Sequence, residues 1–124
     1  MSNGVTLLLV EDNELNRDML SRRLGRAGFA TIIAEDGEQA LERLAETSPA
    51  VVLLDMNLPG IDGWTVCRRV RDNPRLAATP IIALTAHAMA EDRVRALAVG
   101  CDDYATKPID FPDLLDKIGR LIRQ

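Results

Sequence analysis

The stretch VVLLDMNLPGIDG, Val51–Gly63, organises the chain around one acidic residue. Four apolar residues run directly into Asp55, and a proline and two glycines then interrupt any regular continuation. A short unbroken apolar run bounded by proline and glycine is typical of a strand buried on both faces. Asp55 is therefore predicted to lie where a buried strand meets a loop. An aspartate that merely begins a turn fits this stretch equally well, so the rest of the chain has to decide.

Strand and helix patterns alternate five times along the 124 residues. Besides the run ending at Asp55, the predicted strands are Thr6–Val10, Ala30–Ala34, Ile81–Leu84 and Asp103–Thr106. Three of the five strands are continuous apolar runs. This pattern predicts an α/β fold, with a parallel sheet covered by helices on both faces. We expect one domain over residues 1–124, with no second domain, linker or internal repeat.

The predicted helices have recognisable boundaries. Asn13 is a plausible N-cap for a helix through about Ala27, closed by Gly28, and Asp36 with Gln39 resembles a capping box for the next. The other helices are predicted at Gly63–Asp72, Ala88–Val99 and from Phe111 onward. Apolar residues share one face in the first helix (Leu15, Met19, Leu20, Leu24) and are in phase in the fourth (Ala90, Val94, Leu97, Ala98).

Composition narrows the classes of partner. The net charge is −4 and the sequence pI is about 4.9, which argues against direct binding of nucleic acid or of an anionic membrane surface. No apolar run approaches a membrane span, and the N-terminus does not resemble a signal peptide. Two cysteines, Cys67 and Cys101, have no spacing typical of zinc sites. We expect reduced, structural thiols in a cytoplasmic protein.

Polar side chains follow four of the predicted strands. Ligands of open parallel sheets bind outside the carboxyl ends of the strands. Glu11 and Asp12 follow the first strand, Asp55 ends the third, Thr85 ends the fourth, and Lys107 follows the fifth. The sequence thus predicts three carboxylates, a hydroxyl and an ammonium group at one edge of the sheet.

That set of groups suits phosphoryl chemistry. Crowded carboxylates raise one another's pKa unless a cation neutralises them, and Mg²⁺ prefers carboxylate oxygen and water. A carboxylate beside Mg²⁺ can attack phosphorus to form an aspartyl phosphate. Mg²⁺, an ammonium group and a hydroxyl donor would stabilise the charge on the phosphoryl oxygens.

Four motifs carry a resemblance that covers essentially the whole chain. They are VEDN at Val10–Asn13, LLDMNLPGIDG at Leu53–Gly63, LTAHA at Leu84–Ala88 and YATKPI at Tyr104–Ile109. The sequence resembles a response-regulator receiver domain of two-component signalling. Its motifs are most similar to those of receivers attached to hybrid histidine kinases, or of their stand-alone relatives. The resemblance implies a doubly wound (βα)5, flavodoxin-like domain with strand order 2-1-3-4-5.

The resemblance also implies a role for each site residue. Asp55 is expected to be the phosphoacceptor, with Glu11 and Asp12 positioning Mg²⁺ and Asn57 binding the metal through its backbone carbonyl. The groups expected to contact the phosphoryl oxygens are Thr85 and Lys107. Thr85 and Tyr104 are expected to be the switch residues, and the Lys107–Pro108 bond is expected to be cis.

The expected partners follow from the same resemblance. The donor would be a phosphohistidine on a histidine kinase or a histidine phosphotransfer protein. The chain would catalyse only its own aspartyl phosphorylation and dephosphorylation, so it would not be an enzyme in the usual sense. The signal is expected to reach an unknown downstream protein through the face of 88–99, 103–106 and 111–123.

Single residues of this set also have simpler interpretations, and two other functions use similar residues. Glu11 and Asp12 alone could favour a helix dipole, Lys107 could be a solvated lysine, and the only histidine, His87, is expected at the rim of the site. A Mg²⁺-dependent phosphatase of the haloacid-dehalogenase type would have a second aspartate where Asn57 stands. A flavin or nucleotide binder would need a phosphate loop after the first strand, where Glu11 and Asp12 would repel the phosphate.

Overall fold

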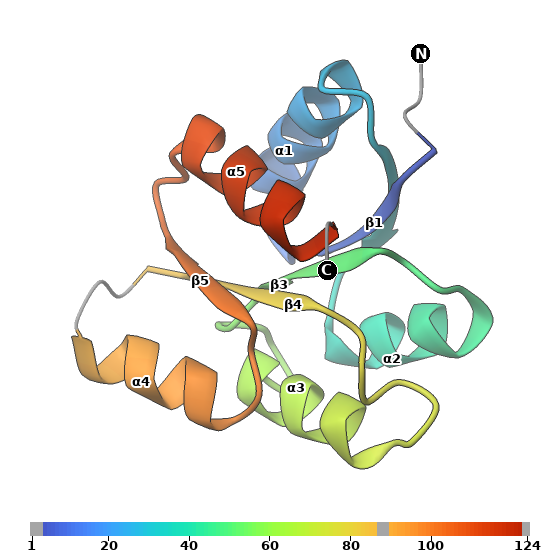
Figure 1. The fold of residues 1–124 in the computed structure, drawn as a ribbon, viewed down its shortest axis with the longest axis vertical. Coiled ribbons are helices and arrows are strands. Elements are labelled where there is room, and N and C mark those ends of the chain that lie inside the picture. The colour runs from blue at the N-terminus through green and yellow to red at the C-terminus, as the bar shows by residue number, and fades with distance from the viewer. Residues whose placement is uncertain (1–3, 87–89, 123–124) are drawn as a thin grey trace.

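In the part of the chain that the structure describes, five parallel strands form one sheet in the order β2-β1-β3-β4-β5, and five helices cover its two faces (Figure 1). The structure is a computed structural model that describes residues 4–86 and 90–122. The strands are β1 Thr6–Val10, β2 Ala30–Ala34, β3 Val51–Asp55, β4 Ile81–Thr85 and β5 Asp103–Thr106. The helices are α1 Glu14–Arg26, α2 Gly37–Glu46, α3 Gly63–Asp72, α4 Ala90–Ala98 and α5 Phe111–Ile122. The predicted fold class and strand order are confirmed.

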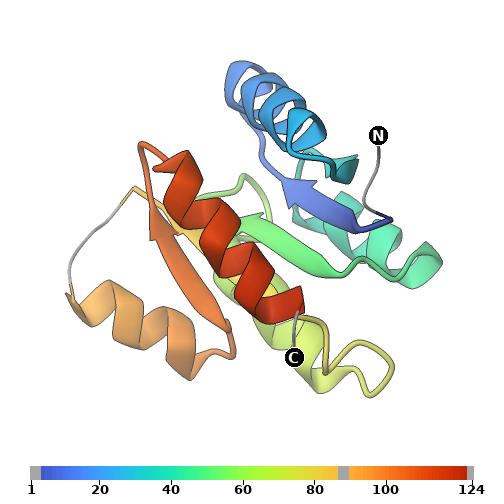
Figure 2. The same ribbon diagram turned by 45° about the horizontal axis from the view of Figure 1, so that its top comes forward.

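The core has two halves because side chains of a strand alternate between the faces of the sheet. Leu7 and Leu9 of β1 lie with α1 and α5, while Leu8 and Val10 lie with α2, α3 and α4. Figures 1 and 2 show these two helical layers on opposite sides of the strands. Strands β3 and β4 are buried along their whole length, which explains why they are continuous apolar runs.

Strand register aligns the carboxyl ends that form the candidate site. Val10 of β1 pairs with Leu54 of β3, and Asp55 pairs with Leu84 of β4. Thr85 in turn pairs with Thr106 of β5. The residues that follow these positions therefore leave the sheet at one edge.

The N-caps predicted for the first two helices are confirmed, with one difference in detail. Asn13 accepts a hydrogen bond from the backbone N–H of Asn16, as an N-cap does. Asp36 likewise accepts from the N–H of Gln39 at 2.8 Å. The Gln39 side chain accepts from the N–H of Glu35 instead of returning to Asp36. The bond that would complete a capping box thus lies one residue earlier.

The apolar faces of α1 and α4 lie differently from a simple inward stripe. Leu20 and Leu24 of α1 are buried, but Leu15 is 81% exposed and Met19 is 49% exposed. In α4 only Ala96 is buried, and the predicted in-phase residues face solvent, with Val94 66% exposed. Helix α4 lies beside β5 at the edge of the sheet (Figure 1). It has less sheet to cover, so one small residue suffices for packing.

The predicted start of this helix at Ala88 lies outside the described residues, as do His87 and Arg123. In the part of the chain that the structure describes, no helix is both long enough and apolar enough to span a bilayer.

Candidate functional site

The ends of β1, β3, β4 and β5 bring the predicted polar residues to one edge of the sheet. Glu11, Asp55 and Thr85 are almost fully buried, with exposed fractions of 0%, 2% and 2%. Such burial is unusual for carboxylates unless they are paired. The burial therefore excludes a purely solvated acidic surface.

Lys107 supplies the pairing charge. Its Nζ lies 3.0 Å from Asp55 Oδ2 and 3.1 Å from Glu11 Oε1. Its backbone N–H donates to the carbonyl of Thr85 at 2.7 Å, which fixes the loop after β5 against β4. The Lys107–Pro108 peptide bond is cis, as the resemblance implies. The lysine bridges two acidic side chains that are 44 positions apart in the sequence (55 − 11).

The two buried carboxylates have opposite pKa shifts. Burial, together with neighbouring Asp55, raises the pKa of Glu11 from 4.5 to about 7, although Lys107 opposes the rise. Burial would also raise the pKa of Asp55, but hydrogen bonds involving Glu11, the Asn57 N–H and Lys107 hold it below its usual value. Asp55 is thus kept as the anion, which a nucleophile must be. Glu11 is the carboxylate whose ionisation the crowding disfavours.

The three carboxylates fit a divalent cation. Ligand oxygens of Glu11, Asp12 and Asp55 all lie within 4.8 Å of one another. Asp12 is exposed, so it offers the cation an approach from solvent. Among the described residues, Glu11 Oε2 is buried without a hydrogen-bond partner, an arrangement that costs free energy unless another group binds it. A hard cation with oxygen ligands, such as Mg²⁺, would satisfy that oxygen and neutralise the cluster.

Asn57 lies beside the acceptor on the loop after β3. Its backbone N–H donates to Asp55 Oδ1 at 2.9 Å, and its side chain is exposed. The metal contact expected of its carbonyl stays a prediction. Farther along this loop, Gly63 allows α3 to start directly against it, because a Cβ there would lie 2.7 Å from the Asp55 carbonyl oxygen.

Arg17 is a site residue that the sequence did not indicate. Its guanidinium donates to the carbonyls of Glu11 and Asp12 at 3.0 and 3.4 Å and lies 3.3 Å from Glu35. It thereby braces the acidic loop after β1 from the first turn of α1. Helix α1 has several arginines, and the sequence does not indicate which of them contacts the loop.

Thr85 and Tyr104 lie on the same face of neighbouring strands. Tyr104 pairs with Ala83 and Thr106 pairs with Thr85, so the two residues are diagonal neighbours. The Tyr104 side chain is only 9% exposed and packs in the core beneath α4. Its ring thus lies largely inside the core, and the switch role expected of Thr85 and Tyr104 stays a prediction.

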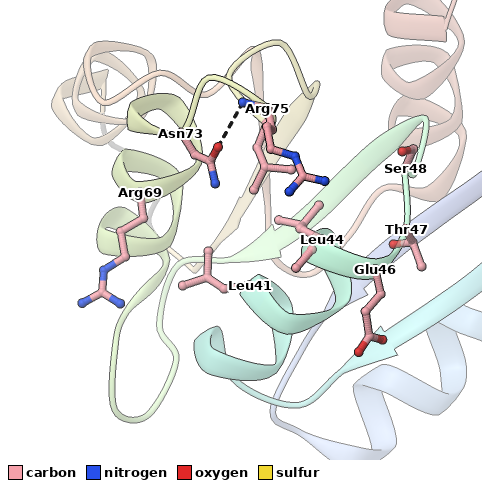
Figure 3. Close-up of a pocket in the computed structure, with 10 residues that line it drawn as sticks. Leu41, Leu44, Glu46, Thr47, Ser48, Arg69, Asn73 and Arg75 are labelled. Atoms are coloured by element: carbon pink, nitrogen blue, oxygen red, sulfur yellow. Dashed lines mark hydrogen bonds between the residues drawn. The ribbon is translucent and has the colours of Figure 1, made fainter.

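Of two pockets in the structure, one borders the acidic residues and the other lies away from them. One, of about 380 Å³, lies between α1 and the loop after β5, lined by residues that include Glu11, Met19, Lys107 and Ile109. Another, of about 490 Å³, lies between the ends of α2 and α3, at the opposite edge of the sheet (Figure 3). Its lining includes Leu41, Leu44, Thr47 and Asn73, and it brings no buried carboxylates together. The candidate site is therefore the acidic edge.

Comparisons with known proteins agree with this geometry. A family model for the response regulator receiver domain matches residues 7–119. The transcriptional regulatory protein GltR of Pseudomonas aeruginosa is 40% identical over 123 residues, which are 99% of this chain and 51% of that protein. The phosphate regulon transcriptional regulatory protein PhoB of Rhizobium meliloti is 38% identical over 95% of this chain and 52% of that protein. The chain thus spans about half the length of the curated relatives it matches.

Solved structures agree equally well. A putative response regulator from Chloroflexus aurantiacus superposes with a TM-score of 0.92 at 33% identity, covering 97% of this chain and 98% of that one. The receiver domain of sensor histidine kinase PA1611 from Pseudomonas aeruginosa gives a TM-score of 0.90 at 34% identity, covering 98% and 99%. That receiver was solved with a magnesium ion coordinated in its active site cleft.

Proposed function

The chain belongs to the response regulator receiver domain family, and from this premise we propose that it accepts a phosphoryl group on Asp55. The donor is a phosphohistidine on a histidine kinase or a histidine phosphotransfer protein, and Mg²⁺ is the cofactor. The observation that carries the proposal is Asp55 itself, a buried anion held by Lys107 beside an acidic cluster that suits a cation.

The chain's own residues would position and stabilise the reacting groups. A carboxylate oxygen of Asp55 attacks phosphorus, the phosphorus–nitrogen bond to the donor imidazole breaks, and that imidazole keeps the electron pair. Lys107 Nζ is 3.0 Å from Asp55 Oδ2, so it is placed to bind an oxygen of the arriving phosphoryl group. Thr85 would donate to another. Mg²⁺, held by Glu11, Asp12, Asp55 and the Asn57 carbonyl, would neutralise the developing negative charge.

The surface next to the site fits an apolar donor helix. Met19, half exposed on α1, and Ile109 in the loop after β5 line the pocket that borders Glu11 and Lys107. A helix that presents a phosphohistidine among apolar residues could cover this pocket and bring phosphorus to Asp55. Leu15, exposed one turn before Met19, would extend the same contact.

The surface that passes the signal on is the face formed by α4, β5 and α5. It would bind a protein partner in the cytoplasm. Exposed Val94 and Leu97 give α4 an apolar surface that the fold does not use. Several relatives are transcriptional regulators, which supports a DNA-binding partner or region downstream while the receiver itself stays acidic. The chain would act only on its own phosphoryl group, and not as an enzyme on other substrates.

Intact-mass measurement with acetyl phosphate and Mg²⁺ tests the acceptor. The wild type should gain one phosphoryl group, and Asp55→Asn should gain none. Asp72→Asn, which removes an exposed aspartate on α3, is the matched control and should still gain one. Equal labelling of Asp55→Asn would overturn the assignment, and sustained hydrolysis of a generic phosphate ester would favour the phosphatase instead.

A further inference from the structure

Two buried thiols meet away from the acidic edge. Cys67 lies on α3 and Cys101 lies between α4 and β5, and their Sγ atoms are 3.6 Å apart. They are free thiols, 0% and 5% exposed, and separated by 34 positions in the sequence. Cys67 Sγ also lies 3.4 Å from the Val99 carbonyl oxygen, to which its thiol donates. The proposed function uses neither residue.

The thiol pair belongs to a longer line of contacts on one face of α3. Trp64, Cys67 and Arg71 are spaced three and four residues apart, so they share that face. Each contacts a residue of the segment 95–102, and we call this line of contacts between α3 and residues 95–102 the α3 seam. The Arg95 guanidinium lies 4.1 Å from the centre of the Trp64 ring, and Arg71 donates to the Gly100 carbonyl and to Asp102, each at 2.8 Å.

Hydrogen bonds fix the backbone on both sides of Cys101. Gly100, immediately before Cys101, is held by Arg71, and Asp102, immediately after, accepts from the Ile81 N–H at 2.8 Å. A disulfide has sulfur atoms about 2.05 Å apart. Only about 1.5 Å of approach therefore separates the two Sγ atoms from bonding distance, and side-chain rotation can supply part of it.

We propose that Cys67 and Cys101 are a modification site, at which a peroxide-class oxidant forms an intramolecular disulfide across the α3 seam. The Cys67 thiol loses its proton and its sulfur attacks one peroxide oxygen; the O–O bond breaks, the leaving hydroxide takes up that proton as water, and Cys67 becomes a sulfenic acid. The sulfur of Cys101, losing its proton, then attacks that sulfenic sulfur and releases a second water. Two thiols and one hydrogen peroxide thus give one disulfide and two waters.

The surroundings assign these roles. The hydrogen bond from Cys101 lowers the pKa of the Cys67 thiol against the effect of burial, and positive Arg71 lowers it further. The same contact raises the pKa of Cys101. Because Cys101 donates its thiol hydrogen to the Cys67 sulfur, the contact favours a thiolate on Cys67, which takes the role of the nucleophile, with Cys101 as the resolving thiol. Cys101 is 5% exposed and Cys67 is 0% exposed, so a small uncharged oxidant would have to pass Cys101 to reach the Cys67 sulfur.

The disulfide would restrain a segment that the proposed function uses. Residues 95–102 comprise the end of α4 and the loop from α4 to β5, and β5 carries Tyr104. A covalent bond to α3 would limit how far this segment can move when Asp55 is phosphorylated. This consequence rests on the proposed function, whereas formation of the bond does not.

Differential alkylation tests the bond. The reduced native protein is treated with hydrogen peroxide, quenched, unfolded in guanidinium and alkylated with N-ethylmaleimide. Because the chain has two cysteines, the reduced protein should take two adducts and the oxidised monomer none, with both restored by dithiothreitol. Peptide mapping should join the segments that contain 67 and 101. Cys67→Ala and Cys101→Ala should form no internal crosslink. Two intact thiols, separate sulfinic acids, or a crosslink that forms only after unfolding would each overturn the proposal.

Amide NMR shifts on adding beryllofluoride and Mg²⁺ test the restraint. The reduced protein should show shifts through residues 95–104, and the oxidised protein should show at most about half of them. Equal shifts in both forms would overturn the restraint. Shifts absent from both would count against the proposed function alone, since the mass measurement reports the disulfide independently.

Discussion

Replacing Glu11 by glutamine should change how the stability of the metal-free domain depends on pH. The folded-state pKa of Glu11 is about 7, above the ordinary 4.5, chiefly because the side chain is buried. A raised folded-state pKa gives stability that is fully present below the unfolded pKa and is lost as pH rises through the folded pKa. The wild type should therefore lose stability between about pH 4.5 and pH 7.

The size of the loss follows from the shift. Each pKa unit corresponds to about 1.4 kcal/mol, so the rise from 4.5 to about 7 gives roughly 2 to 3 kcal/mol between pH 5 and pH 8. Asp55 acts in the opposite sense, since its lowered pKa gives stability that is lost only as pH falls below about 3.8. It therefore does not affect this pH window. Mg²⁺ should remove the loss, because it stabilises the ionised carboxylate.

Urea unfolding with EDTA at pH 5 and pH 8, followed by circular dichroism, measures the effect. Glu11→Gln keeps an acceptor oxygen for Lys107 but cannot ionise, so its stability should change little between the two pH values. At pH 8 it should exceed the wild type by up to the same 2 to 3 kcal/mol. Glu46→Gln, at an exposed glutamate on α2, is the control for loss of a carboxylate. His87 is present in every variant, so its titration cancels from the comparison. The same loss in wild type and Glu11→Gln would refute the reasoning.

Three further substitutions test other parts of the account. Asp12→Asn should weaken Mg²⁺ binding by roughly tenfold or more in calorimetry without unfolding the domain, and unchanged affinity would place the metal elsewhere. Thr85→Ala should still allow phosphorylation of Asp55 but should lose the beryllofluoride-induced shifts around Tyr104. Wild-type shifts in that variant would exclude the coupling. Arg71→Met removes four hydrogen bonds to the Gly100, Ala77 and Thr79 carbonyls and to Asp102, so unfolding free energy should fall by about 2 to 4 kcal/mol. As a control, Arg69→Met replaces an exposed neighbour on α3 and should lower the unfolding free energy by less than about 0.5 kcal/mol.

The strands and the site edge were predictable because both depend on local pattern. Continuous apolar runs identify buried strands, and the carboxyl-end rule then brings Asp55, Glu11 and Lys107 together without knowledge of any contact. The structure adds the distances and shows that Lys107 bridges both carboxylates.

The faces of α1 and α4 were less predictable for a physical reason. Helical periodicity tells which residues share a face, but the position of the helix over the sheet decides which face is covered. Leu15 and Val94 are in phase with apolar neighbours, yet the covering layer does not reach them. Arg17 and Arg71 were also not predicted, because their partners are mostly backbone carbonyls, whose positions a sequence does not show.

Locating the phosphoryl group in the chain tests the central claim most directly. The protein is phosphorylated with acetyl phosphate and Mg²⁺, and borohydride then reduces the acyl phosphate, which converts the labelled aspartate to homoserine. Peptide mass mapping should find homoserine at position 55 and at no other acidic residue. Homoserine at position 12, or reduction of Glu11 in place of Asp55, would contradict the account.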